Sequence, residues 1–315
     1  MTAVQTDFEP AVRQWMAGLS LGKPQRIGTI DLIPVVRTEA TAGEADLLAH
    51  EALAAGALEV LEKDGGVVQE LLARNKAPRP VVIIEGETLV GARQNRIVAH
   101  TVVVAAGKDV VVPVGCMEHG RWRFTSAQFA SGASPSEWKM RREIKASVMR
   151  SRSAGRAAAL DQSALWARVD QELATAEVHS STADYHELVS RRMGEAASLL
   201  SGVRPVGGQV GLLALSEGLL VAIDLVGSSA TWGHLAERAL RSLLPAASDP
   251  EASASRPDAR RLSAEEWLRV LGAARIARRP AIGLGDDFEL AAEGLIGSGV
   301  WLDGHPAHFS AFAPA

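Results

Sequence analysis

Residues 80–117 hold the densest run of β-forming residues in the chain, and this run restricts the fold more than any other feature. Two apolar stretches, 102–106 and 110–114, are joined by Ala106-Gly107-Lys108-Asp109, a pattern typical of a hairpin turn. Because the stretches are almost uninterrupted, both faces of these strands should be covered by other parts of the chain. We therefore expect a hairpin at about 96–117 inside a sheet.

Patterns elsewhere mix strands and helices without regular alternation. Residues 26–37, 203–226 and 286–313 predict strands, whereas 44–56, 157–177, 180–200, 231–244 and 263–277 predict helices. A doubly wound nucleotide-binding fold needs regular strand–helix–strand units and is not expected. The predicted class is α+β, with a mixed or antiparallel sheet core that contains the central hairpin and is packed by several helices from the middle of the chain.

We predict a single intertwined α+β domain over residues 25–315, preceded by an N-terminal extension, 1–24. Although 315 residues could form two domains, we expect the N-terminal and C-terminal strands to share one sheet. Residues 245–261 have almost no aliphatic side chains and predict a mobile linker within that domain.

Composition excludes several classes of protein. The net charge of −4 gives no basic footprint for nucleic-acid binding, so such a partner is not expected. Cys116 is the only cysteine, which excludes an intrachain disulfide and multi-cysteine metal sites and fits a reducing cytoplasm. Apolar runs are far shorter than the ~20 residues of a membrane span. We expect a cytoplasmic protein with no membrane partner.

Standard catalytic and nucleotide-binding motifs are missing from the sequence. It has no P-loop, Gly-rich dinucleotide fingerprint, HExxH helix, GxSxG elbow or EF-hand loop. His305 and His308 lie three apart in a predicted strand, where their side chains point to opposite faces. We therefore assign no metal site.

Two groups of polar side chains flank the predicted hairpin. Antiparallel pairing around Gly107 would place residues near 96–98 opposite residues near 116–118. The two groups would then converge at one end of a rigid sheet, as in a small-molecule site. The candidate ligand-binding residues are Glu85, Glu87, Gln94, Asn95, Arg96, Cys116, Arg121 and Trp122, and the candidate catalytic base is Glu118.

Each residue type suggests a role. Arg96 and Arg121 could hold phosphate or carboxylate groups with two hydrogen bonds each. The amides of Gln94 and Asn95 suit a ribose or a base edge. Glu118 could act as a general base if burial raises its pKa.

A structural interpretation of the same residues is equally concrete. The charged groups could form an ion-pair lattice that fixes a turn, with Trp122 covering the core, because such lattices resemble sites. Cys116 ends an apolar strand and is expected to be a buried, inert thiol. The basic stretch 141–156 is expected to be mainly a solvated helix face.

Six segments form a recognisable set of motifs: GETLVGARQNR (86–96), VVVPVGCMEHGRW (110–122), SEW (136–138), DQSALW (161–166), GQVGLLAL (208–215) and LIGSGVWLDGHPAHFSAF (295–312). With them the chain resembles the ARG- and rhodanese-phosphatase-associated protein domain, a bacterial family, from about residue 25 to its end. That family's name reflects its association with ADP-ribosylglycohydrolases and rhodanese-like phosphatases. The resemblance implies a link to NAD and ADP-ribose metabolism and supplies no settled reaction.

Two functions remain open at this level. The first is a cytoplasmic protein that binds an ADP-ribose- or NAD-derived nucleotide and, if it is an enzyme, hydrolyses it, with Glu85 or Glu87 holding a divalent cation where one is needed. The second is a non-catalytic assembly or regulatory module that acts through a homo-oligomer or a protein partner. The cofactor is unknown in both.

Overall fold

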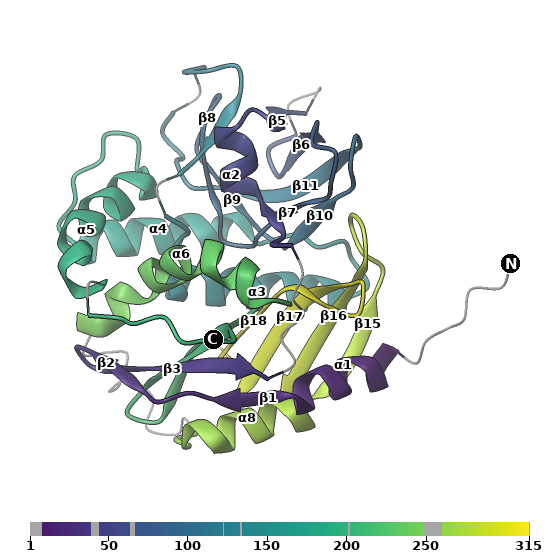
Figure 1. Cartoon of the computed structure of the whole chain (residues 1–315). Coiled ribbons are helices and arrows are strands. Elements are labelled where there is room, and N and C mark those ends of the chain that lie inside the picture. Colours follow the sequence, from purple (N-terminus) through teal and green to yellow (C-terminus); the bar gives the residue numbers. More distant parts are fainter. Residues whose placement is uncertain are drawn as a thin grey trace, which may run out of the picture.

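The computed structural model describes residues 8–38, 44–63, 67–121, 123–132, 134–200, 202–248 and 260–314 (Figure 1). Among them, the largest sheet has nine antiparallel strands from both ends of the chain, in the order β1-β3-β13-β14-β18-β17-β16-β15, with β2 also paired to β3. These strands are β1 Leu19–Leu21, β2 Gln25–Ile27, β3 Ile30–Arg37, β13 Gln209–Ser216, β14 Leu219–Leu225, β15 Arg275–Arg279, β16 Asp286–Ala292, β17 Leu295–Leu302 and β18 His305–Phe312. The predicted sharing of one sheet by the two ends of the chain is confirmed.

The remaining described strands form a second body above the large sheet (Figure 1). A three-stranded sheet has the order β10-β7-β4, and a six-stranded sheet has the order β12-β8-β9-β11-β6-β5. The pair of β4 and β7 makes the three-stranded sheet mixed, and the other two described sheets are antiparallel, in agreement with the predicted α+β class. These strands are β4 Leu47–Leu48, β5 Leu58–Glu62, β6 Glu70–Asn75, β7 Val81–Ile83, β8 Thr88–Gly91, β9 Arg96–Val98, β10 Val102–Val104, β11 Asp109–Cys116 and β12 Phe129–Ser131.

The predicted hairpin at 96–117 is only half correct. β9 and β11 pair with Arg96 opposite Cys116, within two residues of the expected register. The segment 102–104, however, leaves that sheet and pairs with β7. The reason is the polar His100-Thr101 step, whose side chains bond to the interior of the large sheet and turn the chain away from β11.

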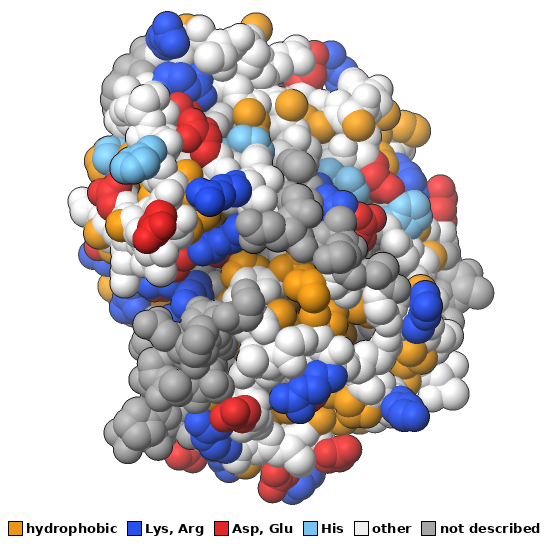
Figure 2. All heavy atoms as spheres, turned by 90° about the vertical axis from the view of Figure 1, so that its left-hand side faces the viewer, with side chains coloured by type: hydrophobic (Ala, Val, Ile, Leu, Met, Phe, Trp, Pro, Cys, Tyr) orange, Lys and Arg blue, Asp and Glu red, His pale blue; other side chains and the backbone are white. Residues whose placement is uncertain are grey.

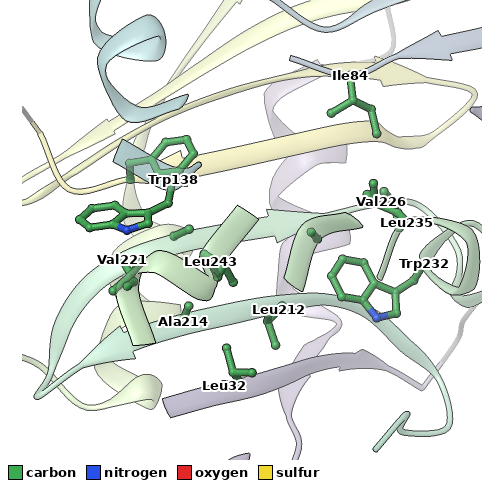
Figure 3. Close-up of a cluster of buried hydrophobic side chains, with 14 of the residues drawn as sticks. Leu32, Ile84, Trp138, Leu212, Ala214, Val221, Val226, Trp232, Leu235 and Leu243 are labelled. Atoms are coloured by element: carbon green, nitrogen blue, oxygen red, sulfur yellow. The ribbon is translucent and has the colours of Figure 1, made fainter. Parts of the chain in front are cut away.

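Helices from the middle of the chain separate the two bodies (Figure 1). They are α3 Trp138–Ser153, α4 Gln162–Thr175, α5 Tyr185–Leu200 and α6 Ser229–Ser248. Apolar side chains of α6 and of the large sheet form one core, which includes Trp232, Leu212 and Leu32 (Figure 3). The opposite face of the sheet is covered by α1 Phe8–Ala17 and α8 Ala264–Ala273, and the short α2 Ala49–Ala54 lies in the second body.

Two predicted boundaries need correction. The described part of the N-terminal extension belongs to the fold, because α1 buries Trp15 against the large sheet and β1 pairs with β3. The predicted linker at 245–261 begins inside α6, which continues through Pro245 because Ala246 and Ala247 are buried and their carbonyls accept hydrogen bonds from Thr29. Residues 249–259 lie outside the described residues.

In the described parts of the chain, every helix is too short or too polar to traverse a lipid bilayer.

Candidate functional site

Strands β9 and β11 bring three of the predicted residues together. Arg96 Nη1 donates to Cys116 Sγ at 2.7 Å and to Gln94 Oε1 at 2.9 Å. All three side chains are at most 2% exposed. Burial raises the pKa of the Cys116 thiol to about 11 despite the nearby guanidinium, so this thiol stays protonated at neutral pH. The expectation of a buried, inert cysteine fits this geometry.

The DQSALW motif supports the same strand end. Asp161 caps α4 by accepting hydrogen bonds from the Ser163 and Ala164 N–H groups. In the next position, Gln162 accepts from the Cys116 N–H at 2.8 Å and donates to the Cys116 carbonyl at 3.0 Å. The motif therefore satisfies backbone groups where β11 leaves the sheet.

Asn95, Glu118 and Arg121 form a second group beside the first. Arg121 Nε lies 2.8 Å from each oxygen of Glu118, and the Asn95 N–H and the Thr182 hydroxyl also donate to that carboxylate. Burial opposes ionisation, but these hydrogen bonds outweigh it and hold the pKa of Glu118 below its ordinary value. The raised pKa expected for a general base is absent. Glu118 is an ionised acceptor that positions its neighbours.

Glu85 and Glu87 point away from these groups. Glu87 pairs with Arg238 of α6 at 2.5 Å. Glu85 faces the large sheet, where its carboxylate contacts Lys145 and accepts from the Ser310 hydroxyl at 2.5 Å. The predicted convergence therefore separates into four sets of contacts, because Glu85 and Glu87 each have partners of their own. Trp122, another predicted ligand-binding residue, lies outside the described residues.

The sequence did not reveal a cluster of buried polar side chains among the described residues, which we term the interior ionic network. Its side chains come from one face of α3, from the 85–101 segment and from the inner face of the large sheet. The α3 residues recur at helical spacing, which is the signal that could have revealed a buried face. The members are Glu85, His100, Thr101, Arg141, Lys145, Arg152, Asp224, Asp287, Ser298, His308 and Ser310.

The centre of this network is a bidentate ion pair. The two terminal nitrogens of Arg141 lie 2.5 and 3.0 Å from the two oxygens of Asp224. Burial opposes ionisation of Asp224, but Arg141 and a hydrogen bond from His308 hold its pKa far below the usual range. Thr101 lies 3.0 Å from the other ring nitrogen of His308 and links the pair to the second body. The network joins the sheet, α3 and the second body.

Buried His100 should make the stability of the protein depend on pH. Its Nε2 lies 2.8 Å from Asp287 Oδ2, which Arg152 also contacts, and burial lowers the pKa of His100. As pH falls below the unfolded pKa of about 6.5, the unfolded chain binds a proton that the folded chain does not. We expect the free energy of unfolding to decrease from pH 7 to pH 5.5.

Urea unfolding over this pH range measures the effect, and His100→Gln should reduce the slope. His50, whose pKa is also lowered by burial, contributes in the same direction and leaves a residual slope. An unchanged slope in His100→Gln would contradict the assignment.

A basic–aromatic loop lies outside the Asn95–Glu118–Arg121 group. We define it as residues 123–128, all exposed, together with Arg93. Phe124 is 57% exposed, and the Arg93 guanidinium lies 4.8 Å from the centre of its ring. Within the described residues, nothing hydrogen-bonds or pairs with the Arg123 side chain. Arg123 and Phe124 are not among the predicted site residues, although the RWRF sequence carries the signal.

Hydrogen bonds with Arg121, Ala92 and Glu59 hold the loop in place. Arg121 Nη1 donates to the Ala92 carbonyl at 2.9 Å and to Thr125 Oγ1 at 3.0 Å. The Ala92 N–H donates to Ser126 Oγ at 3.0 Å, and Ala92 has a positive φ of 45°. Gln128 binds Glu59 at the other end of the loop. A left-handed backbone at a non-glycine residue is costly and is often found at functional sites.

A family model of the ARG and Rhodanese-Phosphatase-superfamily-associated Protein domain matches residues 18–312. The chain belongs to this family. The match begins beside β1 and ends in β18, so this family's domain contains all three described sheets and every predicted site residue. The family's description names associated proteins and gives neither a ligand nor a reaction. Among curated proteins and among solved structures, no match to the chain is found.

The described residues of this family member contain no cluster of three or more His, Cys, Asp or Glu side chains that could hold a metal ion. His308 belongs to the interior ionic network, whereas His305 lies at the start of β18 and contacts its own strand. The imidazoles of His305 and His308 therefore have different partners, as their predicted positions on opposite faces of a strand suggest.

Proposed function

We propose that this protein binds an ADP-ribose- or NAD-derived ligand at the basic–aromatic loop. The observation that carries the proposal is the exposed Phe124 ring with the Arg93 guanidinium over it and the exposed Arg123 next to it in the chain, on a loop bonded to Arg121. Guanidinium groups are suited to phosphates, and exposed aromatic rings are suited to stacking on a nucleobase. The link to ADP-ribose metabolism that the resemblance implies supports this ligand class.

The predicted site residues take supporting roles in this proposal. Gln94, Arg96 and Cys116 are committed to one another, and Glu118 and Arg121 hold the loop. In this proposal the ligand contacts the exposed side chains of Arg93, Arg123 and Phe124 and not the buried residues that the sequence predicted. Because Glu118 is ionised and saturated with hydrogen-bond donors, the proposal is for binding and assigns no catalytic step.

Substitution of Phe124 tests the proposal. Base–aromatic stacking contributes about 1–3 kcal/mol, so Phe124→Ala should weaken ADP-ribose binding roughly 5- to 150-fold. Arg123→Ala should weaken ADP-ribose more than adenosine, because adenosine lacks the phosphates. Isothermal titration calorimetry of the wild-type protein and both variants measures these effects.

Arg269→Ala is the matched control, since it removes an exposed arginine on α8, on the far face of the large sheet. It should bind ADP-ribose like the wild-type protein. The proposal fails if the wild-type protein binds neither ADP-ribose nor NAD, or if Phe124→Ala binds both as tightly as the wild type.

A further inference from the structure

We infer a second ligand site, in a cavity between α6 and the large sheet, for a flat apolar molecule that carries one anionic group. The cavity has a volume of about 510 Å³, within the range of small-molecule sites. We call it the α6 cavity. It opens on the side of the molecule shown in Figure 2, where apolar side chains gather in a depression near the centre.

The walls of the α6 cavity are mainly apolar. Leu32 and Leu212 come from neighbouring strands of the large sheet, and Trp232 comes from α6 (Figure 3). Leu240 and Val203 extend the apolar lining along the helix and along the loop before β13. An indole and several aliphatic side chains favour a planar apolar ligand.

Most polar groups at the cavity already have protein partners. Gln25 donates to the Arg204 carbonyl at 2.9 Å and accepts from the Arg204 N–H at 2.7 Å, which fixes this part of the wall. Gln209 likewise binds the backbone of Val206 and Gly211. Glu237 pairs with Arg241 of the same helix. These groups shape the cavity and do not offer free charge.

Arg204 is the exception. Its side chain lies at the mouth of the cavity and is exposed, and the described residues provide no hydrogen bond or ion pair to its guanidinium. A single unpaired guanidinium above an apolar wall suits one carboxylate or sulfonate. A diphosphate would need more cations, so this ligand class differs from the one proposed for the basic–aromatic loop.

Gly233 provides a way to fill the cavity without disturbing the fold. It lies on α6 and lines the cavity, and a Cβ built there meets no atom within 4 Å. Replacing a helical glycine also favours the helix. Gly233→Leu should therefore fold normally and block the site. Gly272→Leu is the matched control, because Gly272 is a helical glycine of α8 with equally open surroundings.

The experiment titrates 2-naphthoate and neutral 2-naphthamide into the full-length protein by calorimetry. The wild-type protein and Gly272→Leu should bind both, with 2-naphthoate tighter. Gly233→Leu should weaken both at least about tenfold, and Arg204→Ala should weaken 2-naphthoate alone by about tenfold. ADP-ribose binding should be unchanged in Gly233→Leu, which separates this site from the proposed function.

Three outcomes overturn the inference. They are an absence of 2-naphthoate binding to the wild-type protein, wild-type affinity in Gly233→Leu, and equal losses for both probes in Arg204→Ala. The last outcome removes the anionic group from the assigned ligand class.

Discussion

Replacing Asp224 with alanine is expected to lower the free energy of unfolding by about 3–5 kcal/mol, because the buried Arg141 guanidinium loses its bidentate partner and keeps only the Glu85 carboxylate at 4.0 Å. Arg141 is 3% exposed and makes a bidentate contact to Asp224. A water molecule in the space left by the carboxylate would supply no counter-charge. The same change removes the acceptor of His308, so the link between the sheet and the second body should weaken as well.

Urea denaturation monitored by circular dichroism measures this effect. Arg141→Met in the Asp224→Ala background should recover part of the loss, because it removes the uncompensated buried charge. Asp286→Ala is the surface control, and its half-exposed pair with Arg278 should contribute at most about 1 kcal/mol. Equal effects of Asp224→Ala and Asp286→Ala, or no recovery in the double variant, would refute the importance of the buried pair.

Local sequence signals predicted most of the elements and one important register. The capping box of Ser263 and Glu266 opens α8, and Asp303-Gly304 forms the turn between β17 and β18, as the sequence indicates. The pairing of β9 with β11 followed from the turn at Gly107. These features depend on residues close together in the chain, which is why they could be predicted.

Features that depend on distant residues were missed. Nothing local to 102–104 indicates that this segment pairs with β7, or that Thr29 binds the end of α6 beyond Pro245. The basic stretch of α3 was expected to be mainly solvated. Two of its residues, Arg141 and Lys145, are buried because the inner face of the sheet carries acidic and hydroxyl groups that arise more than 80 residues later.

The predicted site likewise divides into contacts that the strand register determines and features that depend on distant residues. The sequence correctly places Gln94, Arg96 and Cys116 together, because β-pairing register alone determines that contact. It could not indicate whether these polar groups face a ligand or one another. Burial decides that question, and burial depends on how α4 and the loop 123–128 cover the end of the sheet.

Replacing Arg121 with methionine is expected to cost about 3 kcal/mol of stability, because buried Glu118 loses its counter-charge. It is also expected to abolish ADP-ribose binding under the proposed function. Arg121 connects Glu118 to Ala92 and Thr125, and no other described side chain makes all three contacts. Without these bonds the basic–aromatic loop loses its fixed position.

Glu118→Gln separates a positioning role from a catalytic or ligand-contacting role. Glutamine keeps the shape and one acceptor oxygen for Arg121, which also retains its bonds to Ala92 and Thr125. We expect Glu118→Gln to bind ADP-ribose within a few-fold of the wild-type affinity, whereas Arg121→Met binds none at temperatures where it is folded. Calorimetry of both variants, with circular dichroism to establish folding, makes the comparison.

If Glu118→Gln loses binding while remaining folded, Glu118 contacts the ligand and the sequence-based assignment is restored. If folded Arg121→Met binds normally, the loop does not carry the site.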